Sequence, residues 1–115
     1  MTLDEFRKTM WAYRETAERE ANVMREPNLA WHRLRELYRG FDALERNLAD
    51  QVLCEWLLND DENVRYDALV VIDEFGIKSA LPALTEHAPR LERSKAPGAP
   101  YELQKVQSIL SKLSN

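Results

Sequence analysis

Side chains that could perform catalysis or bind a metal are few in this sequence. The two histidines, His32 and His87, are not part of a His-x-x-x-His or Glu-x-x-His pattern, the spacings that place two metal ligands on one helix face. We interpret each as an ordinary, partly exposed side chain. Cys54 is the single cysteine and has apolar neighbours, which excludes an intramolecular disulfide and predicts a small buried residue. Because no glycine-rich phosphate loop or nucleophile elbow is present either, we expect no catalysis, metal ion, cofactor or small-molecule substrate.

Carboxylates are the chemical group that this sequence concentrates in one region. Residues 1–39 carry 8 basic and 7 acidic side chains, residues 40–75 carry 2 and 10, and residues 76–115 carry 6 and 3. The middle segment therefore has a net charge of -8 within a total of -4. Such a segment repels phosphate backbones and attracts basic proteins. A solvated face that only maintains solubility is the alternative interpretation.

The candidate binding residues lie around one predicted helix inside this acidic segment. Asp60 and Asp61 have a sufficient local role as turn and N-cap residues, where the helix dipole also favours negative charge. Tyr66 combines a rigid apolar ring with a hydrogen-bonding hydroxyl, which is typical of protein interfaces; a tyrosine packed under the next helix is the alternative. The predicted partner-binding set is Asp60, Asp61, Glu62, Tyr66, Asp67, Asp73 and Glu74.

Helices must position these residues, because apolar side chains recur at steps of three and four along most of the chain. Thr2 and Glu5 predict a capping box for a first helix over residues 3–25, which Pro27 ends. Asn28 is a favourable N-cap for a second helix, and Gly40 suits a left-handed cap at its end. Asp42 and Glu45 repeat the cap-and-acid spacing for a third helix. Since a glycine within a helix costs only about 1 kcal/mol, one continuous helix over residues 29–58 stays open.

Three further helices are expected after residue 59. The fourth helix ends at Phe75 and is closed by Gly76. It places Arg65 where its guanidinium can reach a carboxylate or the carbonyls of a helix end. Ser79 is expected to cap the fifth helix, and Pro89 to kink or end it. Residues 94–100, SKAPGAP, form an expected exposed loop before the last helix. The predicted fold is all-α, with five to six helices in a single compact domain over residues 1–115.

The stretch from Val52 to Leu84 resembles a HEAT repeat of the short bacterial type. The resemblance consists of an aspartate-rich turn, Val-Arg-x-x-Ala in the first helix, a closing glycine and a Leu-Pro-x-Leu element, here Asp60, Asp61, Val64, Arg65, Ala68, Gly76, Leu81, Pro82 and Leu84. It implies antiparallel helical hairpins, with the clearest repeat over residues 52–94. Such repeats bury their faces against neighbours, so the flanking helices are expected to act as divergent caps.

The patterns FDALER, VLCEWLLNDDENVRYDAL and APYELQKV are similar to small immunity proteins of bacterial contact-dependent inhibition and related polymorphic toxin systems. This resemblance implies a cytoplasmic protein that covers the active site or substrate surface of a cognate toxin, often a basic nuclease. The start MTLDEFRK, which lacks the order of a secretory signal, and the absence of a long apolar run agree with a cytoplasmic protein that does not bind membranes.

Two other functions remain open from the sequence. One is a scaffold or adaptor module of HEAT type. The other is a nucleic-acid enzyme that uses the arginines of the first two helices, but interleaved glutamates at helical spacing favour ion pairs over a phosphate-binding face. We therefore expect a protein partner and no nucleic acid. The toxin, the way in which it is blocked and the oligomeric state are not specified by the sequence.

Overall fold

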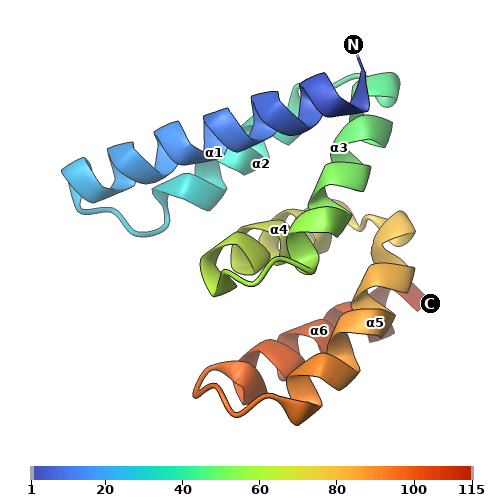
Figure 1. Ribbon diagram of the computed structural model, residues 1–115. Helices are drawn as coiled ribbons and strands as arrows, with labels where there is room; N and C mark the ends of the chain where they lie inside the picture. The colour runs from blue at the N-terminus through green and yellow to red at the C-terminus, as the bar shows by residue number, and fades with distance from the viewer. Residues whose placement is uncertain (1, 115) are drawn as a thin grey trace. The chain divides into compact units, whose positions relative to one another are not determined.

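The computed structural model describes residues 2–114, and over this range the protein is all-α (Figure 1). The predicted fold class is therefore confirmed. None of the helices within residues 2–114 is long and apolar enough to span a membrane. In chain order, the elements are α1 (Leu3–Met24), α2 (Leu29–Arg39), α3 (Ala43–Leu57), α4 (Glu62–Phe75), the short 3-10 helix η1 (Lys78–Ala80), α5 (Leu81–Arg93) and α6 (Ala99–Ser114).

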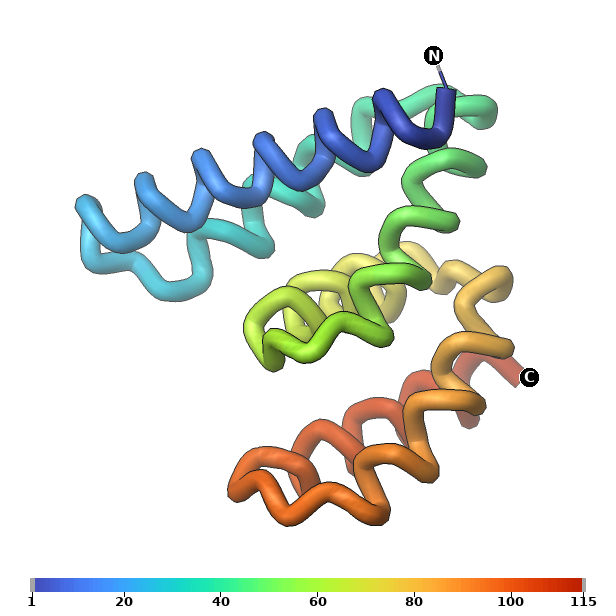
Figure 2. Tube along the Cα trace, viewed as in Figure 1, coloured from blue at the N-terminus to red at the C-terminus, as the bar shows by residue number. Residues whose placement is uncertain are grey.

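The chain divides into two compact units, Met1–Leu53 and Cys54–Asn115, and the boundary falls within α3. In the first unit, α1 and α2 form an antiparallel hairpin (Figure 2). The predicted capping box starts α1, because the Thr2 hydroxyl accepts from the Glu5 N–H at 3.2 Å and the Glu5 carboxylate accepts from the Thr2 N–H at 3.4 Å. The hairpin side of α1 buries Phe6, Met10, Ala17 and Ala21, as its periodicity predicts.

The connection around Gly40 settles whether residues 29–58 form one helix or two. Two helices form, since α2 ends at Arg39 and α3 begins at Ala43. The predicted left-handed cap is wrong, because Gly40 has a φ of -80° and remains in the right-handed region. Asn28 likewise makes no side-chain cap to α2. Asp42 and Glu45 do form the expected reciprocal cap at the start of α3, with distances of 2.8 and 3.0 Å.

In the second unit, α5 and α6 pack together as an antiparallel hairpin, visible in Figure 2. Gly76 closes α4 in the left-handed region with a φ of 60°, as predicted. Ser79 does not cap α5, because it lies inside η1 and α5 begins after Ala80 without a side-chain cap. Pro89 does not end α5, which continues to Arg93. The expected loop is shorter than residues 94–100, because α6 already begins at Ala99.

Candidate functional site

Arg65 connects the start of α4 to α6 within the second unit. Its Nε and Nη2 donate to the two carboxylate oxygens of Glu102, at 2.8 and 3.0 Å. Its Nη1 donates to the backbone carbonyls of Asn59 and Asp60, at 2.9 and 3.0 Å. The expected role of Arg65 is confirmed, because one guanidinium satisfies both a carboxylate and the carbonyls of the turn before α4.

His87 from α5 completes this ion cluster, which we define as Arg65, His87 and Glu102. Its Nε2 lies 2.5 Å from Glu102 Oε2, and the side chain is only 5% exposed. Our interpretation of His87 as partly exposed is therefore wrong, because α6 supplies a buried hydrogen-bond partner. Since an ionised carboxylate only accepts hydrogen bonds, the Nε2–H group of His87 donates a hydrogen bond to Glu102 Oε2. Nδ1 is buried and has no hydrogen-bond partner.

The environment of Glu102 strongly favours its ionised form. Burial alone raises the pKa of this carboxyl group, but the hydrogen bonds from His87 and Arg65, together with their charges, outweigh that effect and lower the pKa to about 2. The bond to Glu102 in turn raises the pKa of Arg65. Because both Glu102 oxygens are occupied and the free imidazole nitrogen is buried, the cluster offers no accessible base. Its effect is to hold α4, α5 and α6 together.

Three predicted site residues come together at the start of α4. Asp60, Asp61 and Glu62 are all exposed. Asp61 is the N-cap that was predicted, since its Oδ1 accepts from the Asn63 N–H at 2.9 Å. The carboxylates of Asp60 and Glu62 make no hydrogen bond or ion pair with any of residues 2–114. Their negative charge therefore faces solvent.

The remaining acidic candidates do not share this surface. Asp67 is only 5% exposed, so its prediction as a contact residue is corrected. Helical periodicity shows which residues share a face of α4 but not that this face is covered. Asp73 is paired with Lys112, whose Nζ lies 3.1 Å from Asp73 Oδ1 and 2.7 Å from its carbonyl oxygen. Glu74 is exposed but lies 12 residues after Glu62, which is about 18 Å along a helix axis.

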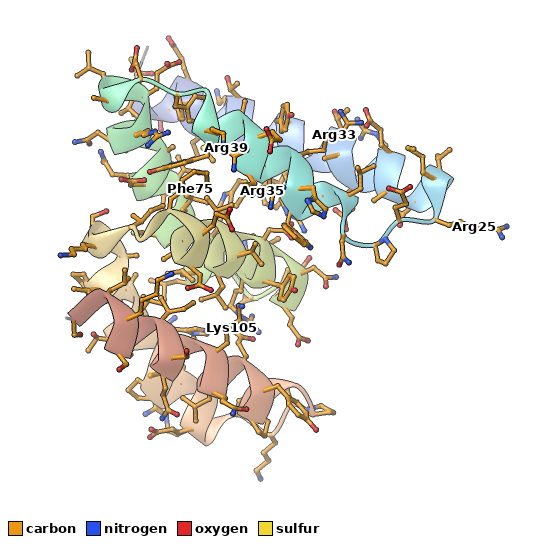
Figure 3. The ribbon with its side chains drawn as sticks, turned by 180° about the vertical axis from the view of Figure 1, so that it is seen from behind. Arg25, Arg33, Arg35, Arg39, Phe75 and Lys105 are labelled. Atoms are coloured by element: carbon orange, nitrogen blue, oxygen red, sulfur yellow. The ribbon has the colours of Figure 1, made fainter. Side chains whose placement is uncertain are left out.

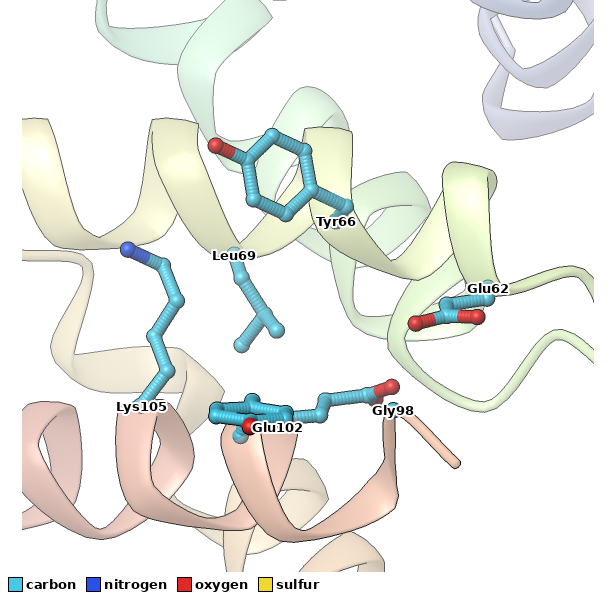
Figure 4. A pocket seen from close by; sticks show the side chains of 7 residues that line it. Glu62, Tyr66, Leu69, Gly98, Glu102 and Lys105 are labelled. Atoms are coloured by element: carbon cyan, nitrogen blue, oxygen red, sulfur yellow. The ribbon is translucent and has the colours of Figure 1, made fainter. Parts of the chain in front are cut away.

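A groove between α4 and α6 continues from the acidic start of α4 (Figure 4). It encloses about 310 Å³, and Tyr66 is 45% exposed at its edge. Two α6 residues that sequence reasoning missed also line it, Tyr101 and Lys105. Tyr101 is 77% exposed. The only sequence signal for them was a tyrosine and a lysine four positions apart on one face of the last helix.

The arginines of the first unit mostly face acidic neighbours, as predicted. Arg33 pairs with Glu20 at 3.0 Å, and Arg39 pairs with Glu36 at 2.9 Å. Arg14 pairs with Glu18 at 3.1 Å and is itself buried. Figure 3 shows Arg33, Arg35 and Arg39 along α2, and Arg25 extending from the end of the hairpin. These pairs reduce the net positive charge that α1 and α2 present.

Within residues 2–114, no group of three or more histidine, cysteine, aspartate or glutamate side chains is arranged to hold a metal ion. The chemistry that the second unit presents is therefore an acidic helix start beside a groove with aromatic walls. Comparison with protein-family models, with curated proteins and with solved structures finds no match for this chain.

Proposed function

We propose that this protein is a cytoplasmic, non-catalytic immunity protein of HEAT-like architecture, which binds a basic bacterial toxin domain through the start of α4. The contact surface, here called the α4 acidic surface, consists of Asp60, Asp61, Glu62 and Tyr66. By covering the active site or substrate surface of the toxin, it prevents the toxin from reaching its substrate. A complex of this kind buries about 1,200 to 2,000 Å² in total.

One observation carries this proposal: exposed negative charge remains next to the groove after the internal ion pairs are made. Arg65 interacts electrostatically with Asp61 and Glu62, but its guanidinium makes its hydrogen bonds to Glu102 and to two backbone carbonyls. Asp60 and Glu62 thus keep a charge that attracts a basic partner and accelerates association. The half-exposed ring of Tyr66 adds an apolar contact with a hydrogen-bonding tip.

A scaffold module of HEAT type is the second candidate function. The antiparallel hairpins support it as well as they support an immunity protein, because repeat folds serve many kinds of assembly. The nucleic-acid alternative has less support, since the arginine pairs with Glu20 and Glu36 use charge that a phosphate backbone would need.

Co-expression tests the proposal directly. The product of the gene immediately upstream, in the arrangement that toxin and immunity pairs share, should arrest growth alone and be harmless when this protein is present. The triple variant Asp60→Asn, Asp61→Asn, Glu62→Gln should lose protection. Asparagine is as good an N-cap as aspartate, so Asp61→Asn retains the cap of α4.

A matched control changes the net charge equally at other exposed carboxylates. The triple variant Glu15→Gln, Glu26→Gln, Glu92→Gln alters three residues outside the α4 acidic surface. It should protect cells as well as the unaltered protein does. If both triple variants lose protection, the effect is due to total charge. If the unaltered protein neither protects cells nor forms a complex with the toxin, the scaffold function is favoured.

A further inference from the structure

The groove between α4 and α6 carries charges of opposite sign at its two ends. Glu62 lies at the end near Gly98, and Lys105 lies at the other end, on the side of the Tyr66 hydroxyl (Figure 4). Neither charged group makes a hydrogen bond or ion pair with any of residues 2–114, and Glu62 interacts with the Arg65 guanidinium only through longer-range electrostatics. Leu69 and Tyr101 provide apolar surface along the groove. The groove is therefore bipolar, with one acidic end and one basic end.

The charge at the acidic end belongs to Glu62 and not to Glu102, although both line the groove. Both oxygens of Glu102 are occupied by Arg65, and one also contacts His87. Glu62 instead lies directly against Gly98, where an added Cβ would be 2.5 Å from its Oε1. The absence of a side chain at Gly98 leaves this place to the Glu62 carboxylate, which closes one end of the groove.

The length of the two helix walls indicates the size of the occupant. Ala99 and Lys105 are six residues apart on α6, and Glu62 and Leu69 are seven residues apart on α4, so the two walls are about 9 and about 10 Å long at 1.5 Å per residue. An extended peptide covers that length with about three residues at roughly 3.3 Å each. The volume of about 310 Å³ lies at the lower end for ligand sites.

We infer that this groove binds a short extended segment of a protein partner, with a lysine or arginine of the segment on Glu62 and a carboxylate about three residues away on Lys105. The residues between the two charges are apolar or aromatic and pack on Tyr66, Leu69 and Tyr101. This inference rests on the proposed function for the identity of the partner. It specifies a sequence pattern in that partner that an acidic surface alone does not require.

A substitution at Lys105 distinguishes recognition by the groove from attraction by the α4 acidic surface alone. If only negative charge attracts the partner, Lys105→Glu adds negative charge and should strengthen binding. If the groove recognises both charges, Lys105→Glu removes one ion pair and should weaken binding. Lys95→Glu, which makes the same change in the exposed segment before α6, serves as the control because Lys95 does not line the groove.

To test this inference, peptides that bind the immobilised protein are selected from a phage-displayed library of random linear heptapeptides. We expect enrichment of peptides with a basic and an acidic residue about three positions apart. Glu62→Lys, Lys105→Glu and Tyr101→Ala should each weaken binding of a selected peptide at least tenfold, while Lys95→Glu should not. Helical circular dichroism of every variant verifies that its fold is intact.

Two results would overturn the groove assignment: no enrichment of such peptides, or equal or tighter peptide binding by Lys105→Glu. These results are separable from failure of the proposed function. Cells left unprotected by a protein that still selects the peptides would refute the immunity role and retain the groove. Protection without any peptide selectivity would retain the immunity role and refute the groove.

Discussion

The carboxylate of Glu102 receives three nitrogen donors, two from Arg65 and one from His87. Removing one member from such a buried group leaves another polar atom without its partner, which costs more than the bond itself contributes. The ion cluster also lies beside the groove, since Glu102 lines it. Stability of the second unit and the shape of the groove therefore depend on the same residue.

The first prediction concerns acidification. The pKa of Glu102 is lowered from its ordinary value of 4.5 to about 2, so the ionised group stabilises the folded state above pH 4.5 and loses this contribution as the pH falls to 2. This lowering of the pKa corresponds to about 3 kcal/mol. The free energy of unfolding should thus differ most between the unaltered protein and Glu102→Gln above pH 4.5, and the difference should shrink toward pH 2.

Urea unfolding followed by circular dichroism at several pH values measures this difference. Glu92→Gln removes an exposed carboxylate of α5 that makes no hydrogen bond or ion pair with residues 2–114, and it should follow the unaltered protein throughout. A difference between the unaltered protein and Glu102→Gln that stays constant from pH 7 to pH 2 would contradict the role of the ionised carboxylate.

Residues whose partners are close in sequence could be predicted, and residues whose partners are distant could not. The turn carbonyls of Asn59 and Asp60 lie six and five positions before Arg65, so helical geometry placed them within reach. Glu102 lies 37 positions after Arg65, and only the packing of α6 against α4 brings it there. The burial of His87 and Asp67 has the same origin, because periodicity shows a helix face but not what covers it.

At the scale of elements, helix ends also differ in whether the local sequence predicts them. The capping boxes at Thr2 and Asp42 and the N-cap at Asp61 each need only a hydroxyl or carboxylate two or three residues before the backbone donor. Glycine is less informative, because it permits a left-handed cap without requiring one. Gly76 adopts that conformation and Gly40 does not.

The two glycines give a prediction at this scale. Gly76 has a φ of 60° with nothing within 4 Å of an added Cβ, so Gly76→Ala suffers backbone strain alone and should lower the free energy of unfolding by about 1 to 2 kcal/mol. Gly40→Ala is the matched control. Its φ is -80° and the nearest atom is 3.6 Å from an added Cβ, so it should be neutral or stabilise by up to about 1 kcal/mol.

Thermal and urea unfolding of both variants, followed at a helical wavelength, measure these free energies. Equal destabilisation by the two substitutions would mean that the conformations of the two caps do not differ in solution. A stabilising Gly76→Ala would mean that α4 does not end in the left-handed region.

At the scale of the whole molecule, the structure shows that only some carboxylates of the acidic segment, residues 40–75, present their charge to solvent. Of the ten carboxylates in residues 40–75, several have internal roles: Asp42 and Glu45 cap α3, Asp67 is buried, and Asp73 pairs with Lys112. A net charge summed over a segment counts all of these equally. The structure assigns the unpaired, exposed part to the start of α4, which the sequence could indicate only as part of a longer region.

This distribution predicts how the rate of complex formation depends on salt. Long-range attraction between unpaired charges accelerates association, and salt screens it, with a screening length of about 30 Å at 0.01 M and about 10 Å at 0.1 M. The association rate with the basic partner should fall markedly between these concentrations. In the triple variant Asp60→Asn, Asp61→Asn, Glu62→Gln, the rate at low salt should be lower and its dependence on salt weaker.

Stopped-flow or surface-binding kinetics at both salt concentrations measure these rates, with the triple variant Glu15→Gln, Glu26→Gln, Glu92→Gln as the control of equal net charge. Steering depends on where charge lies relative to the contact, so the control should keep most of the salt dependence of the unaltered protein. Identical salt dependence in the two triple variants would show that the partner responds to total charge. Because the charges removed from the α4 acidic surface are solvent-exposed, their main effect should fall on the association rate and not on the stability of the fold.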